Sequence, residues 1–361
     1  MRVGVVLEQC LAPVPGGTGR YSREIALALV RRAPAGCAVG GVTAWHRDLV
    51  RIPGVPAYRL AVPRRALVAL WQRGTGPSVG GDVVHAPTPL APPRRRAPLV
   101  VTVHDAVPWT HPETLTPRGV RWHRTVIAAA GRHADAIVVP TRAVADELAR
   151  HVSLGDRVRV IGEGVSAGLR VPGDADERAR RLQLPERYLL TVATLEPRKG
   201  LSVLLAQLAR PEAPTLPLLV AGPAGWGDLD LPSEARRLGI ADRIRVLGRV
   251  PDEDLAVLMA RATALVMPSR AEGFGLPLLE AMSLGTPVVT SPAPALVEVA
   301  GGASLVATDD ELAAALQSVV QDQAQRERMA AAGRARAAAF SWDIAADALW
   351  ALYAEIAERR A

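Results

Sequence analysis

The stretch that decides the fold reads Ala264-Leu-Val-Met-Pro-Ser-Arg-Ala-Glu-Gly-Phe-Gly-Leu-Pro-Leu-Leu-Glu280. Its first four residues have the composition of a buried strand, and an apolar helix-like run follows the two glycines. Glycines let a backbone approach a ligand closely and adopt positive φ. A helix that begins just after such a turn directs its free N–H groups at an anion. Two carboxylates, Glu272 and Glu280, would flank that anion and its neighbouring hydroxyls, an arrangement that suits a nucleotide sugar.

The alternation of strand and helix extends along the whole chain. Strands are expected at Val3–Leu7, Val39–Ala44, Val83–His85, Leu99–His104, Ala136–Pro140 and Val158–Ile161, and again at Tyr188–Ala193, Leu218–Gly222, Ile244–Leu247, Ala264–Met267 and Pro287–Thr290. Helical patterns such as Tyr21–Arg32 lie between them. This order predicts an α/β fold with two doubly wound parallel sheets. Such sheets bind ligands outside the carboxyl ends of their strands, and two facing sheets would form a cleft.

The length of 361 residues also favours two domains. The pattern places one domain at 1–165 and another at 188–342, with a linker at 166–187 where Pro172, Gly173 and several charges interrupt the periodicity. The proline-rich segment Pro53–Pro63 is expected to be a loop. Asp310–Phe340 has the pattern of one long amphipathic helix.

Composition narrows the class of partner. The formal charge is +7, and of 43 basic residues only Lys199 is a lysine. Positive charge suits anionic diphosphates or lipid headgroups, whereas the dispersed arginines and scarce aromatics argue against nucleic acid. The two cysteines form no metal-spaced cluster, which fits a reducing compartment. Because we find no signal peptide and no apolar stretch of membrane-spanning length, we expect a cytoplasmic protein with peripheral membrane contact at most.

Two motifs follow predicted strands of the first half. Pro15-Gly16-Gly17-Thr18-Gly19 opens a helix after the first strand and could cradle a phosphate, although a plain tight turn would look similar. His104-Asp105 ends another strand. The pair could orient a hydroxyl or transfer a proton, or it could be a satisfied histidine beside an aspartate that caps a turn.

A third motif, Glu196-Pro197-Arg198-Lys199-Gly200, follows the first strand of the second half. Two cations at the start of a helix oppose the helix dipole, so an anion is expected to compensate them. A diphosphate would do so, although a solvated charge pair near a loop is the ordinary alternative.

These segments closely resemble the retaining GT-B glycosyltransferases of family 4. Glu272 to Glu280 resembles the family's EX7E motif, and Glu196 to Gly200 resembles its diphosphate loop. The resemblance covers nearly the whole chain and is strongest over Ala264–Ser291. It implies two Rossmann-like domains, an acceptor-side domain completed by a final helix at 343–361 and a nucleotide-sugar-binding domain.

The resemblance also implies roles for single residues. Glu272 would hold the donor-sugar hydroxyls, Glu280 the ribose hydroxyls, and Lys199 with Arg198 the leaving diphosphate. His104 would contact the donor sugar, and Asp105 would help to position the acceptor or its proton. The remaining donor-binding candidates are backbone groups near the sugar, phosphates or base, at Gly16, Gly17, Gly248, Val250, Gly273, Phe274, Gly275 and Leu276. Thr194 stands where many relatives carry arginine, so it cannot supply that charge.

The implied reaction moves a hexose, with retention, from a nucleotide sugar to a glycan or lipid-linked acceptor. The strings around Lys199 and His104 resemble bacterial mannosyltransferases, which favours GDP-mannose, with UDP-glucose and UDP-N-acetylglucosamine open. No cofactor or metal is expected, because Lys199 and Arg198 would replace the metal. A nucleotide-sugar epimerase of the same architecture and a non-catalytic nucleotide- or carbohydrate-binding protein are the alternatives. Arg118, Arg121 and Arg124 could face a membrane or phosphate, or form a solvated helix surface.

Overall fold

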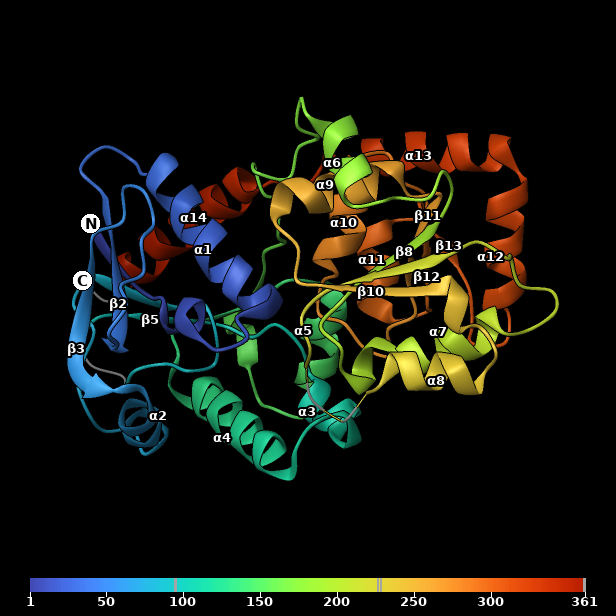
Figure 1. Ribbon diagram of the computed structural model, residues 1–361. Helices are drawn as coiled ribbons and strands as arrows, with labels where there is room; N and C mark the ends of the chain where they lie inside the picture. The colour runs from blue at the N-terminus through green and yellow to red at the C-terminus, as the bar shows by residue number, and fades with distance from the viewer. Residues whose placement is uncertain (94–95, 226, 228, 360–361) are drawn as a thin grey trace. The chain divides into compact units, whose positions relative to one another are not determined.

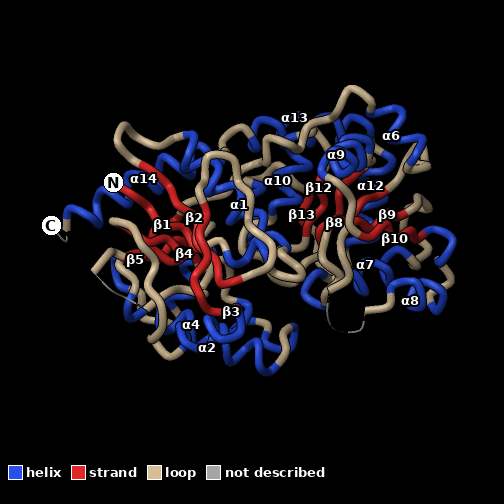
Figure 2. Tube along the Cα trace, turned by 60° about the vertical axis from the view of Figure 1, so that its left-hand side comes forward, coloured by secondary structure: helices blue, strands red, loops and turns tan. Residues whose placement is uncertain are grey.

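The computed structural model describes residues 1–93, 96–225, 227 and 229–359. The chain folds into two compact units, Met1–Gly164 with Ser341–Ala361 and Val165–Phe340. Each unit contains one parallel β-sheet flanked by helices (Figures 1 and 2). Residues 165–187, which include the segment that the sequence suggests as a linker, lie within the second unit and carry helix α6 (Ala175–Arg181).

The first unit has a seven-stranded sheet in the order β3-β2-β1-β4-β5-β6-β7. Its strands are β1 (Arg2–Val6), β2 (Ala38–Trp45), β3 (Ala57–Pro63), β4 (Val83–Ala86), β5 (Leu99–Thr102), β6 (Ala136–Val139) and β7 (Val158–Val160). All neighbouring pairs are parallel. The strand order reverses between β1 and β4, which is the switch point where doubly wound sheets bind ligands.

The second unit repeats this order with six strands, β10-β9-β8-β11-β12-β13. The strands are β8 (Leu189–Val192), β9 (Leu218–Ala221), β10 (Ile244–Gly248), β11 (Ala264–Met267), β12 (Val288–Thr290) and β13 (Leu305–Val306). They are also parallel, and their switch point lies between β8 and β11. Two Rossmann-like sheets therefore confirm the predicted fold class.

Side-chain caps mark the start of five of the described helices. In the first unit the helices are α1 (Gly16–Arg31), α2 (Arg64–Gln72), α3 (Val107–Thr110), α4 (Pro117–His133), α5 (Arg142–Ala149) and α14 (Trp342–Glu358). In the second they are α6, α7 (Leu201–Leu208), α8 (Leu231–Arg237), α9 (Asp252–Arg261), α10 (Leu276–Ser283), α11 (Pro294–Ala300), α12 (Leu312–Gln321) and α13 (Gln323–Ala337). Side chains of Thr116, Thr141, Asp230, Asp322 and Ser341 accept hydrogen bonds from the first turns of α4, α5, α8, α13 and α14.

Aliphatic side chains build both cores, as the scarcity of aromatics predicts. The first core includes Val101, Ile137 and Leu148, and the second includes Leu204 and Val220, all fully buried. Because these side chains come from strands and from the helices that cover them, burial of apolar area fixes each sheet and its flanking helices as one layered body.

Helix α14 belongs to the first unit although it ends the described chain. It packs beside α1, as Figure 1 shows in red and blue. The indole nitrogen of Trp350 donates to the carbonyl oxygen of Leu29 at 3.0 Å, and the hydroxyl of Tyr353 bonds Nδ1 of His85 on β4 at 2.7 Å. These buried contacts, rather than the exposed ion pairs of α14 with Arg31 and Arg32, hold the helix in place.

The Tyr353–His85 contact continues as a buried chain of neutral groups. Nε2 of His85 lies 2.9 Å from Oγ1 of Thr102, which lies 3.3 Å from the hydroxyl of Tyr21. Burial, together with the charge of His104, lowers the pKa of His85 to about 3. The histidine is therefore neutral, and the chain joins α14, β4, β5 and α1 without a buried charge.

Three features depart from the sequence expectation. Pro53–Pro63 is not wholly a loop, because β3 forms there at the edge of its sheet, where proline removes no needed donor. The two-residue strand β13 was not expected. The long helix over Asp310–Phe340 is broken at Asp322, whose carboxylate accepts from the backbone nitrogen of Gln325 at 2.8 Å and starts a separate helix.

Candidate functional site

In the second unit, the backbones of the loops after β8 and β11 approach each other closely at a glycine. Gly200 has φ of +65° and closes the short 3-10 turn Pro197–Lys199 before α7. A Cβ atom at this position would overlap the carbonyl oxygen of Pro268, which directly follows β11. Glycine is therefore required here, and its close approach brings Arg198 and Lys199 to the residues after β11.

The loop after β11 ends in a second glycine turn. Gly275, with φ of +93°, is the N-cap of α10, and a Cβ there would lie 2.5 Å from a methyl carbon of Leu296. No side chain caps this N-terminus, and its first turn contains no acidic residue. The helix thus begins with backbone N–H groups directed back toward the loop that carries Glu272.

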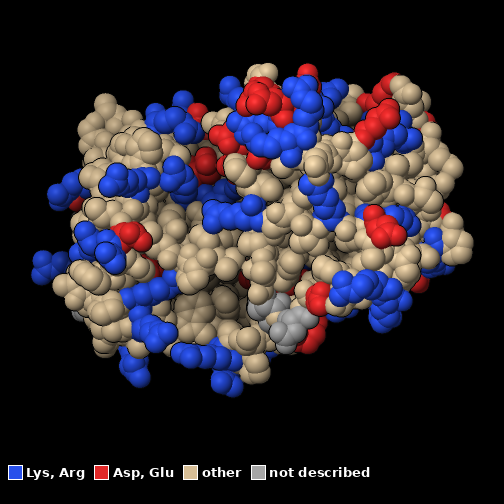
Figure 3. Space-filling model, in the orientation of Figure 1, with Lys and Arg blue, Asp and Glu red and all other residues tan. Residues whose placement is uncertain are grey.

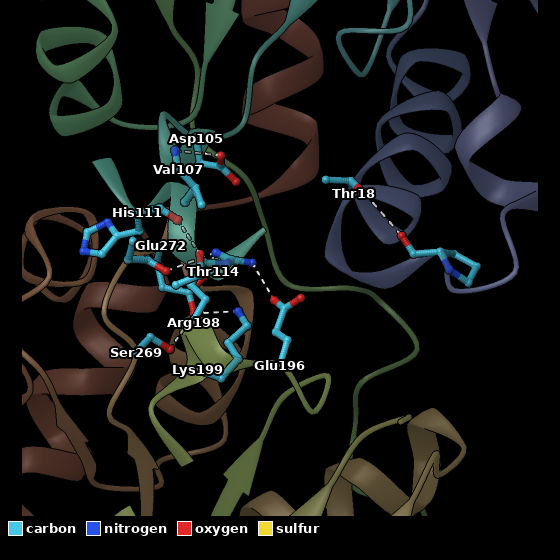
Figure 4. A network of polar contacts seen from close by, with 12 residues as sticks. Thr18, Asp105, Val107, His111, Thr114, Glu196, Arg198, Lys199, Ser269 and Glu272 are labelled. Carbon is cyan, nitrogen blue, oxygen red and sulfur yellow. Dashed lines mark hydrogen bonds and ion pairs between the residues drawn. The ribbon is translucent and has the colours of Figure 1, made fainter. Parts of the chain in front are cut away.

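Glu272 is the centre of the polar cluster in Figure 4. Its Oε1 accepts hydrogen bonds from Nζ of Lys199 at 2.7 Å and from Oγ of Ser269 at 2.8 Å. Its Oε2 accepts from Nη1 of Arg198 at 3.3 Å. The glutamate side chain is only 8% exposed, so this carboxylate is held by two cations in a largely buried place.

Arg198 is held by acceptors on two sides. Its Nη2 donates to Oε1 of Glu196 at 2.9 Å, and its Nη1 donates to the carbonyl oxygen of Ala271 at 3.0 Å as well as to Glu272. The guanidinium plane is therefore fixed by the loops that follow both strands. Two cations and two carboxylates balance in formal charge within this group, Glu196, Arg198, Lys199 and Glu272.

The electrostatics keep Glu272 ionised. Burial by itself raises the pKa of this carboxyl, but the charges of Lys199 and Arg198 and the hydrogen bonds from Lys199 and Ser269 outweigh it. The pKa of Glu272 consequently lies below its ordinary value. A carboxylate of this kind can accept hydrogen bonds from sugar hydroxyls, and the cations beside it can stabilise a phosphate.

The other residues of the nine-residue motif divide between packing and the helix start. The ring of Phe274 is buried and meets Phe340 edge-to-face with centroids 5.6 Å apart. The side chain therefore serves packing, and only the backbone of Phe274 is a candidate for contact with a ligand. Leu276 is also buried. Glu280 is the fifth residue of α10 and is only 2% exposed, a little more than one turn into the helix.

The remaining donor-binding candidates of the second unit lie on neighbouring strand ends. Thr194 and Gly225 are in close contact, since a Cβ on Gly225 would lie 2.8 Å from the methyl group of Thr194. Gly248 ends β10 with φ of +67°, and its carbonyl oxygen accepts from the backbone nitrogen of Gly222 at 2.8 Å. Val250 follows in the loop before α9. Within the part of the chain that the structure describes, none of Thr194, Gly248 and Val250 hydrogen-bonds to Glu272.

In the first unit, α1 begins directly in the glycine loop. Gly16 has φ of +60°, and a Cβ at Gly16 or Gly17 would meet no atom within 4 Å. Oγ1 of Thr18 donates to the carbonyl oxygen of Pro15 at 3.3 Å (Figure 4), and the helix start has no side-chain cap and no acidic residue. The sixteen-residue helix therefore offers an open N-terminus at the carboxyl edge of β1.

His104 and Asp105 follow β5 at the same edge of this sheet. Nε2 of His104 lies 2.8 Å from the carbonyl oxygen of Pro87, and its Nδ1 lies 3.4 Å from Oε1 of Glu163. Oδ1 of Asp105 accepts from the backbone nitrogen of Val107 at 3.1 Å, as Figure 4 shows. Asp105 thus makes the turn-capping contact that the sequence alternative describes, while its second oxygen leaves acceptor capacity.

Comparison with known proteins fits this arrangement. Residues 15–168 match the model of Glycosyltransferase Family 4, and residues 174–336 match that of Glycosyl transferases group 1. O-antigen chain mannosyltransferase B of Escherichia coli is 36% identical over 299 residues, which are 80% of this chain and 77% of that protein. The chain belongs to the family 4 glycosyltransferases.

Other relatives of this glycosyltransferase support the assignment. D-inositol 3-phosphate glycosyltransferase 1 of Catenulispora acidiphila is 33% identical over 303 residues, 75% of this chain and 72% of that protein. Sucrose-phosphate synthase of Thermosynechococcus elongatus has a TM-score of 0.81 at 24% identity, covering 99% of both chains. Anabaena Alr3699/HepE in complex with UDP and glucose has a TM-score of 0.75 at 21% identity, covering 98% of this chain and 100% of that one. At these identities the two structures show the fold alone.

Three polar residues of the glycosyltransferase were not among the predicted site residues. Ser269 contacts Glu272, Glu196 contacts Arg198, and Glu163 contacts His104. Glu196 lies within the motif that contains Lys199, and Ser269 lies three positions before Glu272. Their closeness in sequence to predicted site residues could therefore have indicated them. Glu163 is 59 positions from His104 and follows an ordinary strand, and no local pattern singles it out.

The three arginines on α4 are all exposed. Arg124 is also held in place, because its Nε donates to the carbonyl oxygen of Pro108 at 2.9 Å and its guanidinium lies 6.0 Å from the ring centre of Trp109. Basic side chains gather over α2 and α4 in Figure 3. Within the described residues, no helix is long and apolar enough to cross a membrane, and no cluster of three or more potential metal ligands is found.

Proposed function

We propose that this glycosyltransferase transfers a mannosyl unit from GDP-mannose, with retention of anomeric configuration, to a hydroxyl of a glycan or lipid-linked acceptor. The observation that carries the proposal is the cluster of Glu272, Lys199 and Arg198 at two adjacent strand ends. A reaction that releases a diphosphate needs cations for the leaving group and carboxylates for the sugar, and this cluster contains both.

The cluster supports a particular order of events. Glu272 forms ion pairs with Lys199 and Arg198. The diphosphate would compete for these cations, and the carboxylate would then accept hydrogen bonds from the sugar hydroxyls. As the anomeric C–O bond breaks, negative charge grows on the β-phosphate, where Lys199 and Arg198 would stabilise it. The acceptor oxygen would attack from the same face, with the departing phosphate accepting its proton.

The first unit would contribute around the sugar and the acceptor. The open start of α1 at Gly16 and Gly17 suits the diphosphate or the transferred sugar, and His104 and Asp105 suit the sugar and acceptor. Glu280 would accept hydrogen bonds from the ribose, and Gly248 and Val250 would lie near the base. Thr194 would add a neutral contact to the donor.

Mannose is favoured by the sequence similarity to a protein named as a mannosyltransferase. The acceptor would be a polysaccharide or a lipid-linked glycan, met in the cytoplasm or at the inner face of the membrane. The exposed arginines Arg118 and Arg121 would then interact with anionic headgroups. Family membership favours a transferase over the epimerase and over the non-catalytic binding protein.

Thermal shift with GDP, UDP, ADP and dTDP tests the donor base. A ligand present at about 100 times its dissociation constant adds about 2.7 kcal/mol to the stability of the folded state. We expect GDP to give the largest shift, and a larger shift with UDP would replace GDP-mannose with a UDP-sugar. The anomeric configuration of the product, followed by NMR during turnover, tests retention, and an inverted product would contradict the mechanism.

Chelation tests whether cationic side chains replace a metal. We expect full activity in excess EDTA, because Lys199 and Arg198 supply the positive charge that the leaving phosphate requires. Loss of activity that manganese restores would contradict this part of the proposal.

A further inference from the structure

The ring of His104 has both nitrogens turned toward acceptors of the protein. Nε2 lies 2.8 Å from the carbonyl oxygen of Pro87, in the loop after β4. A carbonyl oxygen can only accept, so this nitrogen carries a hydrogen. Because the contact is short, the tautomer with hydrogen on Nε2 is fixed by the backbone.

Nδ1 of His104 faces a carboxylate. It lies 3.4 Å from Oε1 of Glu163, three residues beyond the end of β7, and the two side chains are 12% and 5% exposed. An ionised carboxylate also only accepts hydrogen bonds. A neutral histidine with hydrogen on Nε2 would direct a lone pair at this carboxylate, which is unfavourable in a buried place. The arrangement is satisfied when both ring nitrogens are protonated.

Three neighbouring titratable groups, besides Glu163, permit this charge. Tyr21 of α1 meets the ring edge-to-face at 4.6 Å, and burial raises its pKa, so it stays neutral. His85 of β4 is neutral for the reason given above. Asp105, the next residue, adds a second favourable negative charge. No group in this set competes with His104 for the role of cation.

We propose that Glu163 is a positioning residue that holds His104 as an imidazolium at the carboxyl edge of β5. Both N–H groups of the ring then serve the protein, so the ring does not remove a proton from the acceptor. His104, the more exposed residue of the pair, is the positive one. It would place this positive charge beside Asp105, where the glycosyltransferase would bind its sugar or the leaving phosphate. This last step rests on the proposed function, whereas the charge state does not.

The pair also makes the first unit sensitive to alkaline pH. Burial lowers the pKa of His104, but the hydrogen bond and charge of Glu163, the carbonyl group of Pro87 and the charge of Asp105 outweigh it and raise the pKa above its ordinary value. A raised folded-state pKa gives stability that is fully present below the unfolded value of about 6.5. That stability is lost as the pH rises through the folded-state pKa.

The charge state can be measured without any assay of activity. Nitrogen-15 NMR of the histidine rings separates protonated from bare ring nitrogens, and a His104→Gln sample assigns the signal among the seven histidines. We expect both nitrogens of His104 to be protonated at pH 7 in the wild type. In Glu163→Gln we expect the pKa of His104 to fall, and in Glu163→Asp to fall by less.

The proposal also predicts that acidic pH restores turnover in the Glu163→Gln variant. In Glu163→Gln we expect transferase turnover to fall about tenfold at pH 8 and less than about threefold at pH 5.5, because acid restores the imidazolium. Glu147→Gln is the matched control, since Glu147 of α5 pairs with the nearby surface residue His151 at 3.1 Å. We expect this control to keep the wild-type pH profile.

Two results would overturn the proposal. One is a bare ring nitrogen on His104 in the wild type at pH 7, which needs no variant that might fail to fold. The other is a Glu163→Gln enzyme whose loss is equal at both pH values, which is what a purely structural role gives. If the NMR result holds while no nucleotide sugar is turned over, the failure belongs to the proposed function and not to the charge state.

Discussion

Two buried polar clusters, one in each unit, use their groups differently. In the first, Tyr353, His85, Thr102 and Tyr21 form a linear chain of neutral groups that hydrogen-bond to one another. In the second, the carboxylate of Glu272, in the loop after β11, is held by two cations of the loop after β8. A neutral chain is complete without a ligand, whereas an ion cluster can exchange one partner for a ligand of like charge.

This difference separates positions that serve the fold from positions that serve the reaction. Both clusters lie in doubly wound sheets, so topology alone would give them similar importance. Charge distinguishes them, because buried ions are retained where their interactions with a substrate repay the cost of desolvation. Variants of the neutral chain should therefore lower stability, and variants of the ion cluster should change binding and turnover.

The largest effect is expected at Lys199. Replacing it with alanine removes a preorganised charge from the proposed leaving group, and we expect turnover to fall by about 10² or more. Steady-state kinetics with the donor identified by thermal shift measures the change. Arg210→Ala is the control, because Arg210 pairs with Glu212 on the surface with both side chains 45% exposed. A loss below threefold at Lys199 would remove this residue from the leaving group and with it the contrast between the units.

Gly164 tests the backbone fit of α14 on the first unit. A Cβ here would overlap the backbone nitrogen of Trp342 and lie 2.6 Å from the carbonyl carbon of Ser341. Since backbone atoms cannot rotate away, we expect Gly164→Ala to lower the free energy of unfolding by about 1–3 kcal/mol. Gly168→Ala is matched, because a Cβ there meets no atom within 4 Å. Equal denaturation midpoints for the two variants would contradict this expectation, because they would show that the start of α14 can shift to accommodate the added methyl group at little cost in stability.

Tyr353 tests the neutral chain itself. Tyr353→Phe leaves Nδ1 of the fully buried His85 without its hydrogen-bond partner, which costs about 1–3 kcal/mol. Chemical denaturation measures the loss, and Tyr58→Phe is the control because its hydroxyl accepts from Gly80 on an exposed surface. We expect nucleotide binding to be unchanged in both. A loss of nucleotide affinity in Tyr353→Phe would break the division between a structural cluster and a reactive one.

The sequence revealed the repeated strand–helix order because parallel buried strands are short, apolar and separated by helices. It failed where local composition was ambiguous, as at β3, where prolines resembled a loop. Lys199 and Glu272 were proposed together through motifs, and the structure brings them to 2.7 Å. The contact between His104 and Glu163 could not be predicted, because it joins loops after β5 and β7 and depends on the strand order of the sheet.

The smallest effect is expected at Glu196, and it examines the charge balance of the ion cluster. Glu196→Gln removes a carboxylate that accepts a hydrogen bond from Arg198 at 2.9 Å. A diphosphate that binds would then be repelled less, and the positive charge of Arg198 would be more available to it. We expect the dissociation constant of the preferred nucleoside diphosphate to fall about threefold at low salt and by less at high salt.

Isothermal titration calorimetry at two ionic strengths measures this change at Glu196. Glu212→Gln, on the surface pair with Arg210, is the control and should leave the dissociation constant unchanged. Tighter binding in Glu196→Gln would mean that the cluster holds its cations partly neutralised until the donor arrives, so that the diphosphate product leaves more easily. Weaker binding would mean instead that Glu196 orients Arg198, because a fixed guanidinium then matters more than the charge that opposes the ligand.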